Sequence, residues 1–290
     1  MTPGGSAVWI EAARPRTLPA AIAPVLVGTA AADRFIAWRA ATAMIVSLAI
    51  QVGVNYANDY FDGMRGVDTP ARSGPRRAVA SGLTSPSRMR VAMLVAFGVA
   101  GIAGIALSIA VGWELLLVGA LCFIAALGYS GGPKPYASRG LGELFVFLFF
   151  GLVATAGSTY VQDERLTIVA VLAAIPVGLL AAAILVANNM RDISSDRAAG
   201  KMTLAVRFGS ARSQTLYRIL VLGAFPWLVL IAGRTDNPWP LLPFACLLLV
   251  PRLHRDVASE EPARLVSVLV GTARLELVFA ILLAVGLWLR

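Results

Sequence analysis

Long apolar segments repeat along this chain, with only short polar connections between them. Each is about 17–25 residues long, the length that an α-helix needs to cross the hydrocarbon core of a bilayer. Because backbone polar groups inside a bilayer must be hydrogen-bonded within the protein, the pattern predicts an all-α, multi-pass membrane protein. Nine spans are predicted, at residues 17–33, 40–61, 89–111, 113–130, 143–162, 167–190, 213–233, 238–253 and 265–288.

The composition supports this assignment. The 290 residues are 58% hydrophobic and only 14% charged, whereas soluble domains carry about 25% charged residues. The first span is not expected to be a cleaved signal peptide, because apolar segments continue to the C-terminus. We expect a single transmembrane domain over residues 1–290.

Basic residues are distributed unevenly between the two sides that these spans define. With nine spans, 19 of the 25 Lys and Arg residues lie on the side of the N-terminus. The positive-inside rule makes that side cytoplasmic, and we expect the protein in the cell (plasma) membrane. The net charge of +9 then reflects topology. No nucleic-acid partner is expected, because the charge lies in membrane-flanking loops.

Histidine and cysteine are too scarce to build a site of their own. The only histidine is His254, which excludes a His-based zinc or iron site. Cys122 and Cys246 both lie in apolar segments, so a disulfide framework is not expected.

Two polar clusters stand where predicted helices end on the cytoplasmic side. Each cluster places one amide and two carboxylates along one helix face, with Asn55, Asp59 and Asp62 at i, i+4 and i+7 and Asn188, Asp192 and Asp196 at i, i+4 and i+8. Asn and Asp are poor helix formers, so helix propensity does not explain them. Two sets of hard oxygen ligands suit a pair of Mg²⁺ ions that hold a diphosphate. The alternative is that each cluster is only a polar helix end in contact with water.

Cationic side chains beside both clusters extend this hypothesis. Arg72 and Arg77 follow the first cluster, and Arg191 and Lys201 lie within or after the second. A diphosphate bridged by two metal ions still carries negative charge, so these side chains are predicted to bind it. Ordinary positive-inside topology is the alternative explanation for them.

Two motifs resemble those of the UbiA family of intramembrane aromatic prenyltransferases. The pattern N-x-x-N-D-x-x-D-x-x-x-G-x-D begins at Asn55 and continues into R-x-G-P-x-R, which ends at Arg77. The pattern N-N-x-R-D-x-x-x-D-x-x-x-G-K-x-T-L begins at Asn188. The stretch from Arg14 to Pro19 also resembles the start of the family's first helix. The resemblance implies about nine transmembrane helices around a central active-site cavity, where two Mg²⁺ ions bind a polyprenyl diphosphate.

A third motif is similar to one branch of that family. Y-x-G-G-P-x-P begins at Tyr129, and R-G-L-G-E follows it and ends at Glu143. Both resemble members that prenylate 1,4-dihydroxy-2-naphthoate in menaquinone biosynthesis. The implied reaction joins the prenyl cation to the ring carbon that bears the carboxylate. Carbon dioxide and diphosphate are released, and demethylmenaquinone forms after oxidation.

The resemblance also implies roles for individual residues. Catalysis is assigned to Asp59, Asp62, Asp192, Asp196 and Lys201. Mg²⁺ is assigned to Asn55, Asp59, Asp62, Asn188, Asp192 and Asp196. The diphosphate is assigned to Arg72, Arg77, Arg191 and Lys201. The acceptor and its cavity are assigned to Asp68, Tyr129, Lys134, Tyr136, Arg139 and Glu143. Aromatic rings either shield the cation or only pack in the core or against lipid, namely Tyr129, Tyr136, Phe145, Phe149 and Tyr160.

Two other functions stay open on the sequence alone. A UbiA-family enzyme with another acceptor, such as 4-hydroxybenzoate, would differ only in its acceptor pocket. A secondary transporter would place polar sites near the middle of the membrane, whereas these clusters lie at helix ends. Arg274 and Glu276 lie inside the last span on different faces of the helix, so they are not expected to pair. They either contact the carboxylate of the acceptor or extend toward the membrane surface, and no catalytic role is assigned to them.

Overall fold

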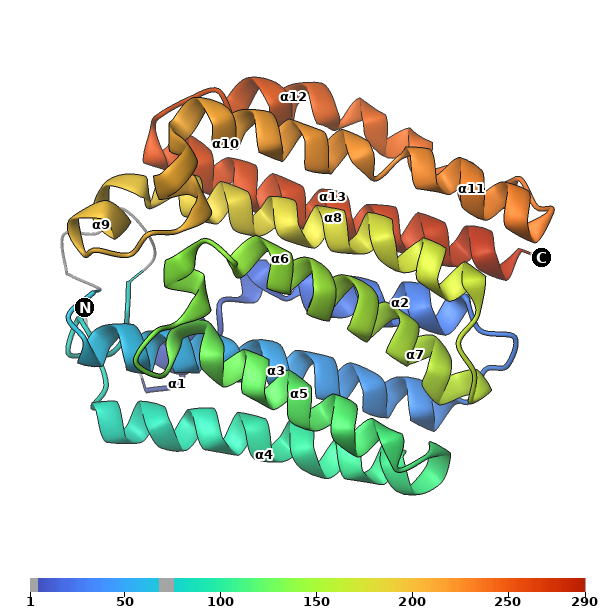
Figure 1. The fold of residues 1–290 in the computed structure, drawn as a ribbon, viewed down its shortest axis with the longest axis horizontal. Coiled ribbons are helices and arrows are strands. Elements are labelled where there is room, and N and C mark those ends of the chain that lie inside the picture. The colour runs from blue at the N-terminus through green and yellow to red at the C-terminus, as the bar shows by residue number, and fades with distance from the viewer. Residues whose placement is uncertain (1–4, 68–75, 290) are drawn as a thin grey trace.

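Helices lying side by side along one common direction form the protein (Figure 1). The computed structural model describes residues 5–67 and 76–289. Within those ranges every regular element is a helix, which confirms the predicted all-α fold.

The first part of the chain forms a layer around one long helix. Its elements are α1 (Gly5–Ala13), the short 3₁₀ helix η1 (Pro15–Thr17), α2 (Pro19–Ala30), α3 (Ala37–Met64), α4 (Pro86–Val111) and α5 (Glu114–Ser130). Helix α3 packs along α4, and both contact α5. Ser85 starts α4, because its side chain accepts a hydrogen bond from the backbone N–H of Arg88.

The middle of the chain surrounds the central helix. Its elements are η2 (Tyr136–Arg139), α6 (Gly142–Val146), the π-helical segment η3 (Phe147–Val153), α7 (Ala154–Asp163) and α8 (Ile168–Arg191). Helix α8 is the most buried of the long apolar helices in the described chain. Segment η3 approaches α8 closely, since a Cβ added to Gly151 would lie 2.5 Å from the Cα of Gly178.

The last part of the chain completes the apolar core. Its elements are α9 (Ile193–Ala198), α10 (Leu204–Gly223), α11 (Pro226–Thr235), the 3₁₀ segment η4 (Trp239–Leu248), α12 (Val250–Asp256) and α13 (Pro262–Trp288). Helix α8 packs against both α10 and α13. Buried residues such as Leu180, Tyr217 and Phe279 fill the space between them.

The predicted spans coincide with helical runs along the described chain. Six runs are long and apolar enough to cross a membrane by length and composition. Three shorter apolar helices, α2, α5 and η4, occupy the remaining predicted spans. Whether these three cross the bilayer stays a prediction, so the number of nine crossings does too. In η4, prolines at 240 and 243 lack the N–H groups that α-helical hydrogen bonds require.

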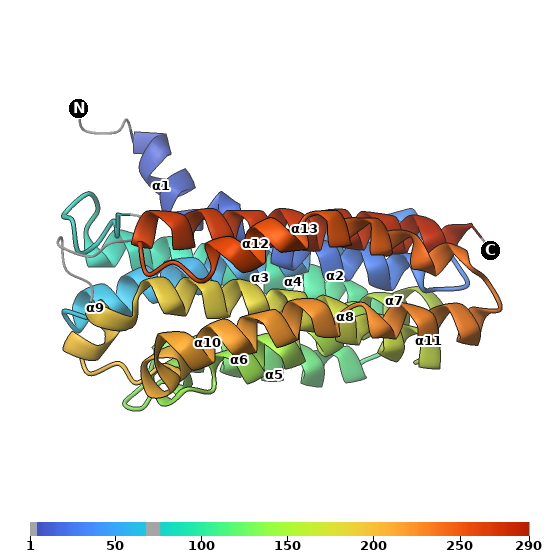
Figure 2. The same ribbon diagram turned by 90° about the horizontal axis from the view of Figure 1, so that it is seen from above.

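The two ends of the helix bundle differ. Helices α1 and α9 and the C-terminal end of α3 gather at one end, which we call the motif end (Figures 1 and 2). The C-terminus and the α2–α3 connection lie at the opposite end. There, Asp163 accepts hydrogen bonds from the backbone N–H groups of Asp33 and Arg34, at 2.9 and 3.0 Å. These contacts tie α7 to the connection between α2 and α3.

Candidate active site

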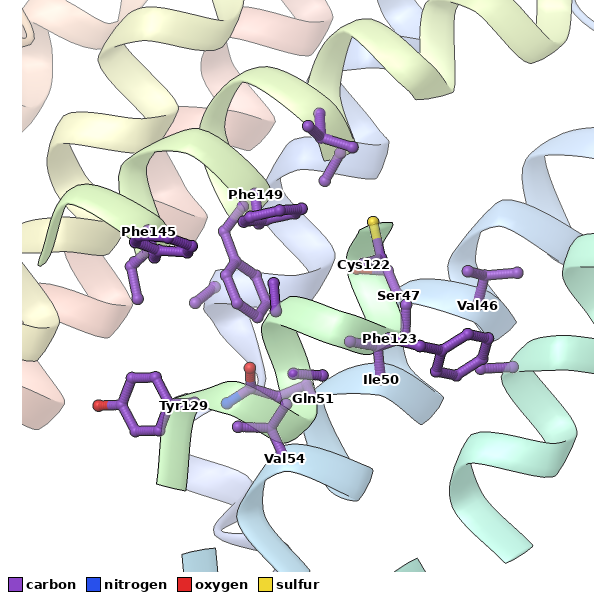
Figure 3. A pocket seen from close by; sticks show the side chains of 18 of the residues that line it. Val46, Ser47, Ile50, Gln51, Val54, Cys122, Phe123, Tyr129, Phe145 and Phe149 are labelled. Atoms are coloured by element: carbon purple, nitrogen blue, oxygen red, sulfur yellow. The ribbon is translucent and has the colours of Figure 1, made fainter. Parts of the chain in front are cut away.

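A cavity of about 510 Å³ runs between the two polar clusters and the interior of the bundle. Its wall is mostly apolar, and helices α3, α4, α5 and α8 and segment η3 contribute to it. Figure 3 shows Phe145 and Phe149 on one side of this space, with Val46 and Ile50 of α3 and Phe123 of α5 on the other. The carboxylate and amide side chains of the two clusters that line the cavity at its motif end are Asn55, Asn58, Asp62, Asn188, Asp192 and Asp196, and cationic side chains join them there.

On the α3 side, the residues that line the cavity are buried and held by hydrogen bonds. Asp62 is 3% exposed, and its carboxylate pairs with Lys201 Nζ at 3.3 Å and with Arg65 at 3.2 Å. Asn58 accepts a hydrogen bond from the Ser130 hydroxyl at the end of α5. Its amide oxygen therefore has a fixed direction. Asn58 was not among the predicted ligands.

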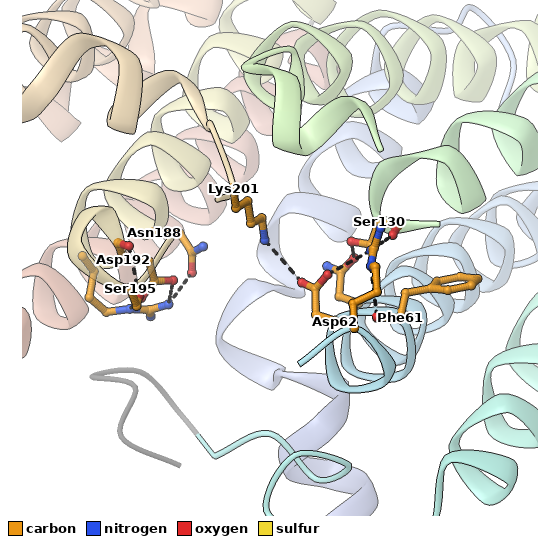
Figure 4. A network of polar contacts seen from close by, with 10 residues as sticks. Phe61, Asp62, Ser130, Asn188, Asp192, Ser195 and Lys201 are labelled. Carbon is orange, nitrogen blue, oxygen red and sulfur yellow. Dashed lines mark hydrogen bonds and ion pairs between the residues drawn. The ribbon is translucent and has the colours of Figure 1, made fainter. Parts of the chain in front are cut away.

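On the α8 side, an arginine inside the motif neutralises the first carboxylate. Arg191 donates to both carboxylate oxygens of Asp192, at 2.8 and 2.6 Å, and to the amide oxygen of Asn188, at 3.0 Å. Arg191 and Asp192 are both buried. Figure 4 shows this group across the cavity from Asp62, with Lys201 between them.

Lys201 reaches the cavity because the chain reverses after α9. Gly200 has a φ of 71°, a left-handed conformation that residues with a Cβ rarely adopt. The following N–H, that of Lys201, donates to the carbonyl of Asp196 at 2.8 Å. This turn brings the lysine back beside the second cluster, and its ammonium group extends to Asp62 on α3. The G-K pair of the motif is thus a turn that delivers a cation.

Two other residues of the first cluster hold neighbouring chain segments. Asn55 donates to the carbonyl of Ala13 at 2.8 Å and lines the cavity as well. Asp59 accepts hydrogen bonds from the backbone N–H groups of Ala78 and Val79, and it is not among the residues that line the cavity. Helical spacing predicted Asp59 beside Asp62 as a ligand, but the structure does not bring Asp59 to the cavity wall.

Four stacked or edge-on aromatic rings continue from the motif end into the cavity. Ring centroids are 5.5 Å apart for Tyr129 and Tyr136, 4.0 Å for Tyr136 and Phe145, and 6.0 Å for Phe145 and Phe149. All four residues line the cavity. Burial raises the pKa of the Tyr136 phenol, so its hydroxyl stays protonated and donates to the carbonyl of Ala125 at 2.8 Å. Tyr160 does not line the cavity and donates instead to Glu114.

The residues predicted for the acceptor lie in different environments. Lys134 and Arg139 are exposed and do not line the cavity. Glu143 is buried, and its carboxylate accepts a hydrogen bond at 2.9 Å from Asn189, which lines the cavity. Asp68 and Arg72 lie outside the described residues.

The N-terminal segment contributes cavity residues that were not assigned from the sequence. Arg14 and Thr17 line the cavity. The Thr17 hydroxyl accepts a hydrogen bond from Gln51 of α3 at 3.1 Å. The only sequence signal was the stretch from Arg14 to Pro19, to which no role was given. Arg274 is exposed and Glu276 fully buried, as their different helix faces predicted, and neither lines the cavity.

The donor atoms at the motif end suit a hard divalent cation. Carboxylate and amide oxygens line the cavity from both sides, and Mg²⁺ prefers such ligands, commonly with substrate phosphates completing its coordination. Among the described residues, no three His, Cys, Asp or Glu side chains converge into one preformed metal cage. The arrangement therefore fits ions that bind together with an anionic substrate lying between α3 and α8.

Comparison with known proteins identifies the family of this chain. Residues 21–275 match the UbiA prenyltransferase family. A protein of Mycobacterium tuberculosis named 1,4-dihydroxy-2-naphthoate octaprenyltransferase is 42% identical over 284 residues, which is 96% of each chain. An Escherichia coli protein of the same name is 35% identical, over 97% of this chain and 95% of the relative.

Two solved structures of UbiA homologs share the fold of this chain. A UbiA homolog from Archaeoglobus fulgidus bound to GPP and Mg²⁺ has a TM-score of 0.68 at 13% identity, covering 98% of this chain and 100% of that chain. A UbiA homolog from Aeropyrum pernix K1 has a TM-score of 0.69 at 17% identity, covering 93% and 95% of the two chains. The resemblance seen in the motifs is confirmed, and this multi-pass membrane protein belongs to the UbiA prenyltransferase family.

Proposed function

We propose that this protein transfers a polyprenyl group from a polyprenyl diphosphate to 1,4-dihydroxy-2-naphthoate in menaquinone biosynthesis. The new bond joins the allylic carbon to the ring carbon that loses its carboxylate as CO₂. Diphosphate leaves, and the demethylmenaquinol formed gives demethylmenaquinone on oxidation. The observation that most directly supports this proposal is a single cavity with an apolar, aromatic body and with carboxylates and cations at one end. The names of relatives that match nearly the whole chain point to the same reaction.

The cations at the motif end would hold the diphosphate. Arg77 and Lys201 line the cavity, and charge-assisted hydrogen bonds from such groups to phosphate oxygens are among the strongest in proteins. Arg191 is already bound to Asp192 and Asn188. Its contribution to the diphosphate would therefore require these contacts to rearrange. Arg72 retains its predicted role from the motif alone.

Two Mg²⁺ ions would complete this end of the cavity. We assign them to Asp62 with the amides of α3 on one side, and to Asn188, Asp192 and Asp196 on the other. When bound, the ions would neutralise the negative charge that develops on the departing diphosphate. A UbiA homolog bound to both GPP and Mg²⁺ supports this assignment of the metal. Mg²⁺ dependence and the number of two ions are part of the proposal.

The apolar body of the cavity would protect the allylic cation. The rings of Tyr129, Tyr136, Phe145 and Phe149 line it without offering a nucleophile stronger than a protonated phenol. Aromatic faces attract cations by about 0.5–2 kcal/mol each, and excluding water prevents hydrolysis of the intermediate. The buried Asn189–Glu143 pair lies beside this region and would contact the acceptor through the Asn189 amide.

The remaining assignments follow from topology and sequence. We propose one catalytic domain over residues 1–290, in the plasma membrane, with the motif end facing the cytoplasm. Membrane lipid would surround the bundle and leave the prenyl tail in an apolar environment. The polar clusters lie at one end of the cavity rather than midway along broken helices, and family membership argues against a secondary transporter.

Product mass distinguishes between acceptors. Purified protein with Mg²⁺, a polyprenyl diphosphate and either 1,4-dihydroxy-2-naphthoate or 4-hydroxybenzoate is expected to give a product only with the naphthoate. Mass spectrometry should show addition of the prenyl group and loss of one CO₂. A product with 4-hydroxybenzoate alone would replace the proposed acceptor, and no product with either would overturn the proposed reaction.

Lys201→Ala is expected to raise the KM for the polyprenyl diphosphate more than the KM for the naphthoate. The lysine supplies a charge-assisted contact of about 1.5–3 kcal/mol, equivalent to about 10–150-fold in an apparent constant. The naphthoate carries a single carboxylate and would depend on other groups. Steady-state titration of each substrate measures both constants.

Arg252→Ala is a suitable control for that experiment. Its side chain is 87% exposed and pairs only at the surface, with Asp256, so both KM values should stay unchanged. If Lys201→Ala shifted the naphthoate constant more than the diphosphate constant, Lys201 would belong to the acceptor site.

A further inference from the structure

Asp59 stands among the predicted metal ligands, yet its carboxylate is engaged elsewhere. Oδ2 accepts a hydrogen bond from the backbone N–H of Ala78, and Oδ1 accepts one from that of Val79, each at 2.9 Å. Asp59 is 1% exposed and is not part of the cavity wall. Its two oxygens are therefore directed at a neighbouring segment and not at the space between the two clusters.

The segment that Asp59 holds is a tight turn. The N–H of Ser81 donates to the carbonyl of Arg77 at 2.8 Å, and the N–H of Leu83 donates to that of Ala78 at 2.9 Å. The carboxylate therefore binds two consecutive amides at the start of this turn, and hydrogen bonds to a charged acceptor are about twice as strong as neutral ones.

A second contact of α3 fixes the same turn. Gly63 lies one helical turn beyond Asp59, and a Cβ added to it would lie 2.7 Å from Cγ1 of Val79. The absence of a side chain at Gly63 thus allows Val79 to approach the helix. Two contacts, one polar and one steric, set the position of residues 78 and 79 against α3.

Arg77 comes immediately before these two residues, and its side chain lines the cavity. The same flank of α3 makes a parallel contact nearer the N-terminus. There Asn55 donates to the carbonyl of Ala13, and the next residue, Arg14, also lines the cavity. This flank of α3 therefore docks two segments that each place an arginine at the motif end, while Asn58 and Asp62 face the cavity directly.

We infer that Asp59 is a positioning residue for Arg77 and does not ligate the metal. The inference deepens the proposed function, because the diphosphate is the anion that Arg77 would bind. Asp59 fixes the backbone from which the guanidinium enters the cavity. Without it, binding the diphosphate would require Arg77 to be ordered at that moment, at a cost in conformational entropy.

The first test compares the KM for the polyprenyl diphosphate with the Mg²⁺ concentration that gives half-maximal activity. Asp59→Asn keeps the side-chain shape but replaces one acceptor oxygen by an NH2 group, so one of the two backbone N–H groups loses its acceptor and the other binds a neutral oxygen. It is expected to raise the KM for the polyprenyl diphosphate about tenfold and to change the Mg²⁺ concentration for half-maximal activity less than about twofold. Asp62→Asn, which alters a proposed ligand, should instead shift the Mg²⁺ requirement.

Gly63→Ala tests the same turn without touching any charge. Its Cβ would displace Val79, so it should raise the same KM and leave the Mg²⁺ requirement unchanged. Asp59→Asn combined with Arg77→Ala should bind the diphosphate no more weakly than Arg77→Ala alone, within about twofold, because the two residues act as one unit.

Binding of inorganic diphosphate gives a readout that does not depend on turnover. Calorimetry with inorganic diphosphate and Mg²⁺ should show similar losses of affinity for Asp59→Asn and Arg77→Ala. Asp163→Asn is the matched structural control, because Asp163 also binds two consecutive backbone amides, at 2.9 and 3.0 Å, at the opposite end of the bundle. It should lower Tm as Asp59→Asn does, but leave diphosphate affinity unchanged.

The outcomes separate this inference from the proposed function. An Mg²⁺ requirement shifted as strongly by Asp59→Asn as by Asp62→Asn would overturn the positioning role. Additive losses in the double variant would overturn it as well. A wild-type protein that neither turns over nor binds diphosphate would overturn the proposed function, whatever the variants do.

Discussion

Asp62→Ala and Asp192→Ala are each expected to lower kcat by about 10²–10³-fold, because each removes a charged oxygen ligand from an electrostatically assembled site. Asp62 lies on α3 and Asp192 at the end of α8, on opposite sides of the cavity. Both are almost fully buried. Loss of either should therefore impair one side of the diphosphate site while the other side stays intact. Initial rates at saturating substrates measure the effect.

Controls must separate loss of chemistry from loss of fold. Removing Asp62 leaves the Lys201 ammonium without its carboxylate partner, which costs stability when the group is buried. Asp62→Asn keeps the shape of the side chain and should show a similar loss of rate with a smaller change in Tm. Glu164→Ala, which breaks a half-exposed ion pair with Arg39 at the far end, should keep full activity. Near wild-type rates for both aspartate variants would exclude the proposed metal site.

Removal of divalent cations is expected to abolish prenyl transfer, with a loss of at least about 10³-fold. The carboxylates that line the cavity would repel the diphosphate unless cations compensated their charge. Mg²⁺ or Mn²⁺ should restore activity, because the available ligands are hard oxygen atoms. The experiment is a dialysis against EDTA followed by titration of each metal while product is quantified by mass.

The same metal titration shows whether a divalent cation or the protein's own cationic side chains neutralise the Asp62 carboxylate. Lys201 and Arg65 already contact Asp62, and these contacts would have to give way when a metal ion binds that carboxylate. Lys201→Ala should therefore lower the Mg²⁺ concentration for half-maximal activity, because the metal ion no longer competes with the lysine for Asp62. The same variant should weaken diphosphate binding. Full activity after EDTA treatment, with no response to added metal, would show that the cationic side chains alone suffice.

Much of the architecture could be predicted because it depends on local properties of the chain. Apolar runs of membrane-spanning length require helices, and the described chain contains helices at each predicted span. The polar clusters ended those runs, so their position at one end of the bundle followed from the order of the helices. The motifs around Asn55 and Asn188 were specific enough to indicate the family.

Which face of a helix meets the cavity depends on its neighbours and could not be predicted in this way. Asp59 and Asp62 are only about 60° apart around the helix axis, so spacing grouped them together. The turn at Ala78 and Val79 packs against the flank that carries Asp59. Asn58, on the other flank beside Asp62, faces the cavity and the Ser130 hydroxyl.

Packing between neighbouring elements also decides which cationic side chains reach the cavity and which residues of the third motif line it. Asn55 of α3 donates to the carbonyl of Ala13, a contact between segments far apart in sequence, and the next residue, Arg14, lines the cavity. Lys134 and Arg139 share a motif with Tyr129 and Tyr136, but their side chains point to the surface while the two rings line the cavity. By itself the sequence determined the helices, the family and the chemical types of the site residues, since these depend on local composition and spacing. Only the tertiary structure decided which side chains face the cavity and which hold the segments around it, because that depends on packing between elements distant along the chain.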